Sequence, residues 1–172
     1  AMADLKSALE APSMATPKHV FEVYIRTSPE RLWQALTDGD LTQRYYHDTR
    51  VASGWKVGDA ITYTWTDGTV TIDGQIVEAD APRRLVHTFH FTQDPEQAAE
   101  RPSRCTWEIE PMGEACLLRL IHDGFDGETS TYRSVGNVKG WSFILSGLKT
   151  VLETGESLHI AETAEATAGR KD

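Results

Sequence analysis

The feature that most constrains the fold is a one-faced helical pattern near the end of the chain, between Gly140 and Gly155. The apolar residues of this segment recur three or one positions apart, which places them on one side of an α-helix. They are Trp141, Ile144, Leu145, Leu148, Val151 and Leu152. Gly155 follows the last of them, where glycine can adopt the left-handed conformation that ends many helices. A helix with one apolar face must be covered, so we expect it to lie across a sheet.

Most of the chain before this helix is predicted to form antiparallel strands. Residues 19–26 alternate between apolar and polar side chains, which is typical of a half-buried strand. Strand-like runs also occur at 59–65, 70–78, 85–91, 104–110 and 116–122. Because consecutive antiparallel strands usually neighbour one another, we expect a meander that the first strand closes.

Two helices are predicted between the first strand and the rest of the sheet. Ser28 followed by Pro29 and Glu30 is a typical helix start, because a hydroxyl caps the first turn and an acid lies beside the positive helix end. A second short helix is expected after Asp38-Gly39. The polar segment 92–102 contains two prolines and is predicted to be a loop.

Composition limits the classes of partner. The net charge of −9 argues against nucleic-acid binding through a general electrostatic attraction. No apolar stretch approaches the roughly 20 residues that cross a bilayer, and the start of the sequence lacks a signal-peptide pattern. We therefore expect a cytoplasmic protein. One domain is predicted over residues 18–155, preceded by an extension or tag-derived segment (1–17) and followed by a flexible tail (156–172).

The two cysteines are expected to be reduced. Cys105 and Cys116 lie on opposite arms of a predicted hairpin that turns near Met112-Gly113. That turn places Cys105 beside Leu120 rather than beside Cys116, so a disulfide is not expected.

Several segments resemble one known family. They are SPERLWQALTD (28–38), GQIVEADAPRRLVHTF (74–89), HDGF (122–125), and GW followed by LKTVLETG in the final helix. In order and spacing they resemble homologues of the C-terminal domain of the heat-shock chaperone ATPase activator, within the START-like SRPBCC superfamily. The family often carries a tryptophan where this chain has Tyr45-Tyr46-His47.

The resemblance implies an α+β helix-grip fold. In that fold a curved antiparallel sheet of six or seven strands wraps around a long C-terminal helix, with two short helices after the first strand. It also implies a cavity between the sheet and the helix, but no particular ligand, because this fold hosts many functions.

The residues expected to face the cavity share an inward position in the predicted fold. They are Tyr46, Tyr63, Trp65, His87, Phe89, Cys105, Trp107, Leu118, His122, Trp141 and Leu145. The alternative is that these residues are simply core. His87 and His122 either orient the polar end of a ligand, or act as acid–base groups, or are core histidines bonded to a neighbour. No catalytic residue, cofactor or metal site is predicted, because the six histidines lack ligand spacing.

Three functions are compatible with this sequence. The first is binding or sensing of a small apolar molecule without chemistry, favoured because no nucleophile–base motif is present. The second is a protein-interaction module that regulates a chaperone ATPase or acts in a stress response. The third is a polyketide cyclase-like or hydrolase-like enzyme that uses the same cavity. The expected partners are a small apolar ligand or a protein such as a chaperone, and the chain is expected to be a monomer or a homodimer.

Overall fold

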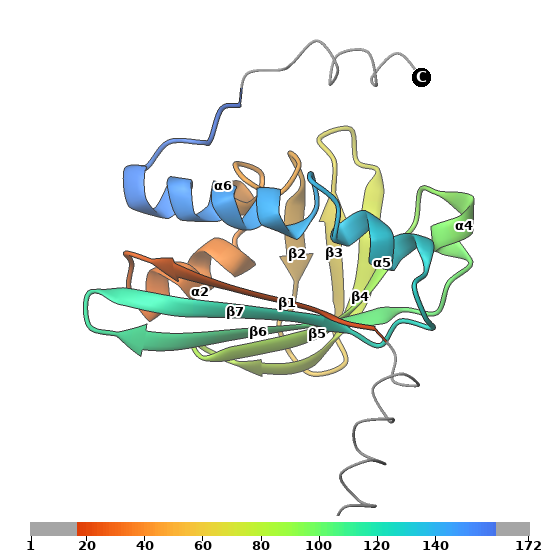
Figure 1. Cartoon of the computed structure of the whole chain (residues 1–172), viewed down its shortest axis with the longest axis horizontal. Coiled ribbons are helices and arrows are strands. Elements are labelled where there is room, and N and C mark those ends of the chain that lie inside the picture. The colour runs from red at the N-terminus through yellow and green to blue at the C-terminus, as the bar shows by residue number, and fades with distance from the viewer. Residues whose placement is uncertain (1–16, 161–172) are drawn as a thin grey trace, which may run out of the picture.

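The computed structural model describes residues 17–160. The predicted extension (1–17) and the predicted tail (156–172) therefore fall largely outside the described residues. The described part contains a single seven-stranded sheet with helices on one of its faces (Figure 1). Among these residues, no helix is both long enough and apolar enough to cross a bilayer.

All seven strands are antiparallel and follow the order β1-β7-β6-β5-β4-β3-β2. They are β1 (His19–Ile25), β2 (Arg50–Ser53), β3 (Ala60–Thr64), β4 (Val70–Asp80), β5 (Arg84–Phe91), β6 (Ser103–Met112) and β7 (Ala115–Asp123). The predicted meander is confirmed, since β1 returns to pair with β7 along its full length.

The predicted helices are confirmed. α6 (Trp141–Thr154) lies across the sheet in Figure 1 and ends at Gly155, whose φ of 78° is left-handed. α2 (Pro29–Thr37) begins after Ser28, whose hydroxyl accepts a hydrogen bond from the backbone N–H of Arg31 at 3.2 Å. The short helix α3 (Gly39–Thr42) follows it directly. The architecture is the α+β helix-grip fold that the resemblance implied.

Two local predictions need correction. β2 was not predicted, because a strand of four residues offers too little alternation to detect. The segment predicted as a loop contains the single-turn helix α4 (Pro95–Ala98), which Asp94 caps. The connection before α6 contains α5 (Ser130–Val135), a short helix that the sequence left open for residues 124–136. Such short helices depend on capping rather than on an apolar periodicity.

The register of the β6–β7 hairpin also differs from the prediction. Cys105 pairs with His122, not with Leu120, because the turn contains only Gly113 and Glu114. Gly113 has a φ of 66°, which makes so tight a turn possible. The prediction of reduced cysteines is confirmed, because Cys105 and Cys116 are both free and buried.

The main core lies between α6 and the face of the sheet that it covers. Leu145 and Leu148 of α6 belong to one cluster of buried side chains with Trp107 and Leu118 of the sheet. The middle of the apolar face of the helix is therefore packed against side chains of the sheet.

The close approach of β4 to β5 at Gly74 gives a test of the packing in this sheet. A Cβ added at Gly74 would lie 2.0 Å from the carbonyl oxygen of Thr88 on β5, a backbone atom that cannot turn away. Gly74→Ala should therefore lower the free energy of unfolding by about 3 kcal/mol, measured by urea denaturation. Gly113→Asn is the control, because nothing lies within 4 Å of its Cβ position and asparagine tolerates a left-handed turn. Equal stability of the two variants would contradict this account.

Candidate ligand-binding cavity

An open cavity of about 400 Å³ lies beside the N-terminal end of α6. Its walls come from the loop before β2, from Trp65 just after β3, from strands β4 and β5, from α4 and α5, and from the first turn of α6. The buried part of the wall is apolar and includes Tyr46, Ile72, Phe89, Val135, Trp141 and Ile144. Exposed polar residues form the rim, namely His47, Gln93, Asp94, Ser134, Asn137 and Lys139.

The structure divides the predicted cavity residues into two groups. Tyr46, Trp65, Phe89 and Trp141 line the cavity. Tyr63, His87, Cys105, Trp107, Leu118, His122 and Leu145 are buried in the packed region beneath α6 and do not line it. The space implied by the resemblance is thus displaced toward one end of the helix, because large side chains fill the middle.

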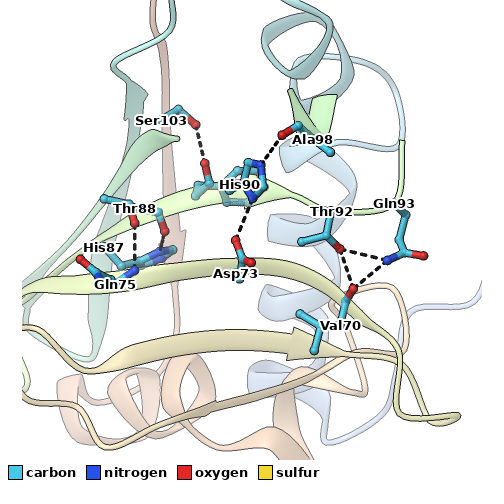
Figure 2. Close-up of polar contacts among 11 residues, drawn as sticks. Val70, Asp73, Gln75, His87, Thr88, His90, Thr92, Gln93, Ala98 and Ser103 are labelled. Atoms are coloured by element: carbon cyan, nitrogen blue, oxygen red, sulfur yellow. Dashed lines mark hydrogen bonds and ion pairs between the residues drawn. The ribbon is translucent and has the colours of Figure 1, made fainter. Parts of the chain in front are cut away.

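His87 is held in the core by two hydrogen bonds. The indole Nε1–H of Trp107 donates to His87 Nε2 at 3.1 Å. On the other side of the ring, His87 Nδ1 lies 2.9 Å from the carbonyl oxygen of Thr88 (Figure 2). An indole nitrogen can only donate, so Nε2 must be the acceptor and the proton resides on Nδ1. His87 is therefore neutral, with both ring nitrogens engaged.

His122 forms a second arrangement of the same kind. The Nε1–H of Trp141 donates to His122 Nδ1 at 2.9 Å, which leaves the proton on Nε2. His122 Nε2 lies 2.7 Å from Ser103 Oγ, and that hydroxyl in turn donates to the carbonyl oxygen of Phe89 at 3.2 Å. A chain of hydrogen bonds thus links the start of α6 to strands β7, β6 and β5.

These two networks decide between the interpretations of the inward histidines. Burial lowers the pKa of His87 to about 4 and that of His122 to about 3, where the nearby His87 and His19 also contribute. Both side chains are fully shielded from solvent, with 0% of their surface exposed. Neither imidazole has a free nitrogen for a ligand or a proton transfer, so the geometry supports the core interpretation.

The two adjacent tyrosines, where the family often has a tryptophan, differ in how their hydroxyls are satisfied. Tyr45 donates from its hydroxyl to the carbonyl oxygen of Ala35 at 2.6 Å. Tyr46 stacks on Tyr63 with ring centroids 4.4 Å apart and meets Trp141 edge-on at 5.7 Å. Within residues 17–160 the buried hydroxyl of Tyr46 has no hydrogen-bond partner. Burial raises the pKa of both phenols well above the ordinary value.

His47 joins the rim of the cavity to the start of α6. Its backbone is left-handed, with a φ of 48°, and its ring stacks on Phe143 with centroids 5.3 Å apart. Its Nε2 lies 2.7 Å from the carbonyl oxygen of Lys139, one residue before the N-cap Gly140. A non-glycine residue in this conformation is held there by such contacts.

Several cavity residues were not predicted. Phe91 lies two residues after Phe89 on β5, so the alternation of this strand indicates that both side chains lie on the same face of the sheet. Ile144 lies on the helix face that was predicted to be apolar, and Ile72 lies in the run 70–78, which was predicted to be a strand. Val135 and the polar rim belong to α4, α5 and loops, whose positions depend on tertiary packing and left no pattern in the sequence.

The tyrosine pair gives a test of hydroxyl burial. Tyr45→Phe loses a hydrogen bond and leaves the Ala35 carbonyl unpaired, so it should lower the free energy of unfolding by about 1 kcal/mol. Tyr46→Phe removes a buried hydroxyl that has no partner, so it should raise that free energy by up to about 1 kcal/mol. Urea denaturation at neutral pH measures both, and a loss of stability in Tyr46→Phe would contradict the assigned environment.

The neutral histidines predict a specific response to acid. Below the ordinary histidine pKa of about 6.5 the unfolded chain gains protons that native His87 and His122 do not accept, so stability falls. The two residues together should remove roughly 3 kcal/mol of stability between about pH 7 and about pH 5. Proton NMR of the native protein should show both rings still neutral at about pH 5. A native ring that titrates near 6.5 would show that it is not sealed in the core.

Comparisons with known proteins agree with this fold. A search of curated proteins gave no significant match. The crystal structure of protein MLL2253 from Mesorhizobium loti is similar, with 24% identity, coverage of 79% of this chain and 96% of that one, and a TM-score of 0.66. The Aha1 dimer from Colwellia psychrerythraea is 19% identical, covers 83% of this chain and 100% of that one, and has a TM-score of 0.65. An Hsp90 activator from Plasmodium falciparum is 21% identical over 83% of this chain and 91% of that one, with a TM-score of 0.54.

These three structures share the helix-grip fold with this chain. At the level of sequence, residues 26–153 match the family model described as activator of Hsp90 ATPase homolog 1-like protein. The matched segment runs from the end of β1 almost to the end of α6 and so includes most of the fold. The chain therefore belongs to the family of activator of Hsp90 ATPase homolog 1-like proteins.

Proposed function

We propose that this protein binds a small, largely apolar molecule in the cavity beside the start of α6. The observation that carries the proposal is the cavity itself, about 400 Å³ in volume, with an aromatic and aliphatic wall and polar groups gathered at its rim. Pockets of this size and composition are typical of small-molecule sites. The ring edges of Phe89 and Trp141 favour a ligand with flat apolar surface.

Binding without chemistry is favoured over catalysis by the state of the histidines. The two imidazoles that could act as a buried base, His87 and His122, are neutral and fully bonded. A general base must reach the proton that it removes, and neither residue lines the cavity. The buried wall of the cavity thus offers shape and apolar surface, and the titratable side chains His47, Asp94 and Lys139 lie at its exposed rim.

Regulation of a chaperone ATPase by a direct protein contact is the second candidate function. The family match favours it, because the family is described by a member that activates such an ATPase. Large apolar residues also stand exposed close to the cavity rim, where Trp65 is 43%, Val70 36% and Val138 82% exposed. Exposed apolar residues of this kind are a common component of protein-docking surfaces.

The binding proposal is tested with N-phenyl-1-naphthylamine, a neutral aromatic probe whose fluorescence rises in apolar surroundings. We expect saturable binding and a higher melting temperature, since a ligand at one hundred times its Kd stabilises the native state by about 2.7 kcal/mol. Ser134→Trp should abolish both effects, because Ser134 is exposed at the cavity rim. Ser142→Trp is the matched control, because Ser142 is exposed on α6 and does not line the cavity.

Two outcomes would overturn this proposal. One is equal binding by the two tryptophan variants, which would place the probe elsewhere on the surface. The other is a failure of the wild-type protein to bind this probe and also fatty acids, flavonoids, sterols and polyketides. That second result would leave the protein-interaction function as the better account of the fold.

A further inference from the structure

We propose that His90 is a pH-dependent clasp on this cavity: its doubly protonated ring holds α4 against the sheet, and loss of one proton frees α4 to move away from the cavity rim. The role of the clasp in ligand exchange rests on the proposed binding function. The clasp itself rests on contacts that are independent of any ligand.

His90 bridges a strand and the short helix α4 (Figure 2). It lies on β5 directly opposite Asp73 of β4, and its Nδ1 is 2.8 Å from Asp73 Oδ1. Its Nε2 is 2.9 Å from the carbonyl oxygen of Ala98, the last residue of α4. The side chain is 22% exposed, so protons can reach it from solvent.

Both partners of the ring are acceptors, and this fixes the protonation state that satisfies them. A carboxylate oxygen and a backbone carbonyl oxygen can only accept a hydrogen bond from the ring. A neutral imidazole carries one N–H and can satisfy either Asp73 or Ala98, whereas an imidazolium carries two and satisfies both. The geometry around His90 therefore matches the charged ring, in contrast to the indole-bonded His87 and His122.

The charges around His90 favour the same state. The hydrogen bond to the Ala98 carbonyl raises the pKa of His90 above its ordinary value, partial burial opposes this, and Asp73 and Glu100 raise it further. Arg101 and Asp126 lie across the adjacent polar pocket and are paired with each other at 2.6 Å. Asp73 and Glu100 are thus the two acidic side chains that act on the ring.

The position of α4 explains how the clasp would act on the cavity. Gln97 of α4 lines both the ligand cavity and the neighbouring polar pocket of about 130 Å³, so α4 contributes to the partition between the two spaces. No residue of α4 is buried, so little apolar packing holds the helix in place. The residues after α4 add two further tethers: the Glu100 carboxylate accepts hydrogen bonds from the backbone N–H and hydroxyl of Thr131 at the start of α5, and Arg101 pairs with Asp126.

The direction of the pH effect follows from the raised pKa. Only the charged ring of His90 donates two hydrogen bonds, one to Asp73 and one to Ala98. Both bonds are present at pH values below the ordinary histidine pKa of about 6.5, and one of them is lost as the pH rises through the higher pKa of folded His90. We therefore expect α4 to be held most firmly in mild acid. Ligand should enter and leave the cavity more slowly there than in mild alkali.

The test measures the release rate of N-phenyl-1-naphthylamine by stopped-flow dilution at about pH 5.5 and about pH 8.5, on either side of the histidine range. For the wild type we expect release to be about three- to tenfold faster at the higher pH, the effect of weakening one hydrogen bond at a partly exposed site. His90→Gln should release the probe at the fast rate at both pH values. The glutamine amide is neutral and has a single nitrogen, so it cannot donate to Asp73 and to the Ala98 carbonyl from the two positions that the ring nitrogens occupy.

Asp73→Asn is the matched variant, and it should behave in the opposite way. The asparagine amide can donate to Nδ1, so a neutral ring with its proton on Nε2 satisfies Asn and the Ala98 carbonyl together. Release should then be slow at both pH values. A merely structural role for the Asp73–His90 pair predicts instead that both variants loosen α4. A pH-dependent release that persists in His90→Gln would overturn the proposal.

Hydrogen exchange of the ligand-free protein separates failure of the clasp from failure of the binding proposal. The amides of Ala98, Ala99 and Glu100 are bonded within α4 and its C-terminal turn. They should exchange about three- to tenfold faster in His90→Gln than in wild type at about pH 5.5, and at closely similar rates at about pH 8.5, where the wild-type ring is neutral. Equal protection at the lower pH would overturn the clasp even if the probe binds. The expected difference would support the clasp even if the probe does not bind.

Discussion

The hydrogen bond between Trp141 and His122 is the interaction on which the arrangement of this molecule depends. It joins the first residue of α6 to β7 at 2.9 Å and continues through Ser103 to the backbone of β5. These hydrogen bonds fix the distance between the N-terminal end of α6 and the sheet. Trp141 also lines the cavity, so one side chain both anchors the helix and forms part of the wall. Buried hydrogen bonds of this kind specify a unique packing when every member is satisfied.

The sequence predicts the elements of the fold far better than it predicts the cavity. The α6 face and the strand alternation identify inward positions such as Phe89 and Trp141, and both are inward in the structure. Whether an inward side chain meets another side chain or open space depends on how the volumes of opposite elements fit. Trp107 and Leu118 are inward too, yet α6 packs directly over their region. The rim residues are not predicted for a further reason, because α4 and α5 are short helices of four and six residues that are fixed by caps and tertiary contacts.

Three histidines of the sheet, two on β5 and one on β7, show why residue type alone does not reveal a role. His87 and His122 face indole donors, so each must keep one nitrogen free of a proton to accept. His90, three residues after His87, faces two acceptors and is best satisfied as a cation. A sequence pattern reports which strand face each residue occupies. It does not report whether the partner across the strand donates or accepts, and that chemistry sets the charge.

The two candidate functions of this protein meet at one surface. The exposed side chains of Trp65 and Val138 stand beside residues of the cavity rim, so a protein seated on them would also cover the cavity opening. Such a partner would slow ligand exchange, and by reciprocity a ligand that altered the rim would change the affinity for the partner. Because α4 contributes Gln97 to the cavity wall, its position would be part of this coupling. Under the two proposed functions, ligand binding and partner binding at this rim would therefore be linked rather than independent.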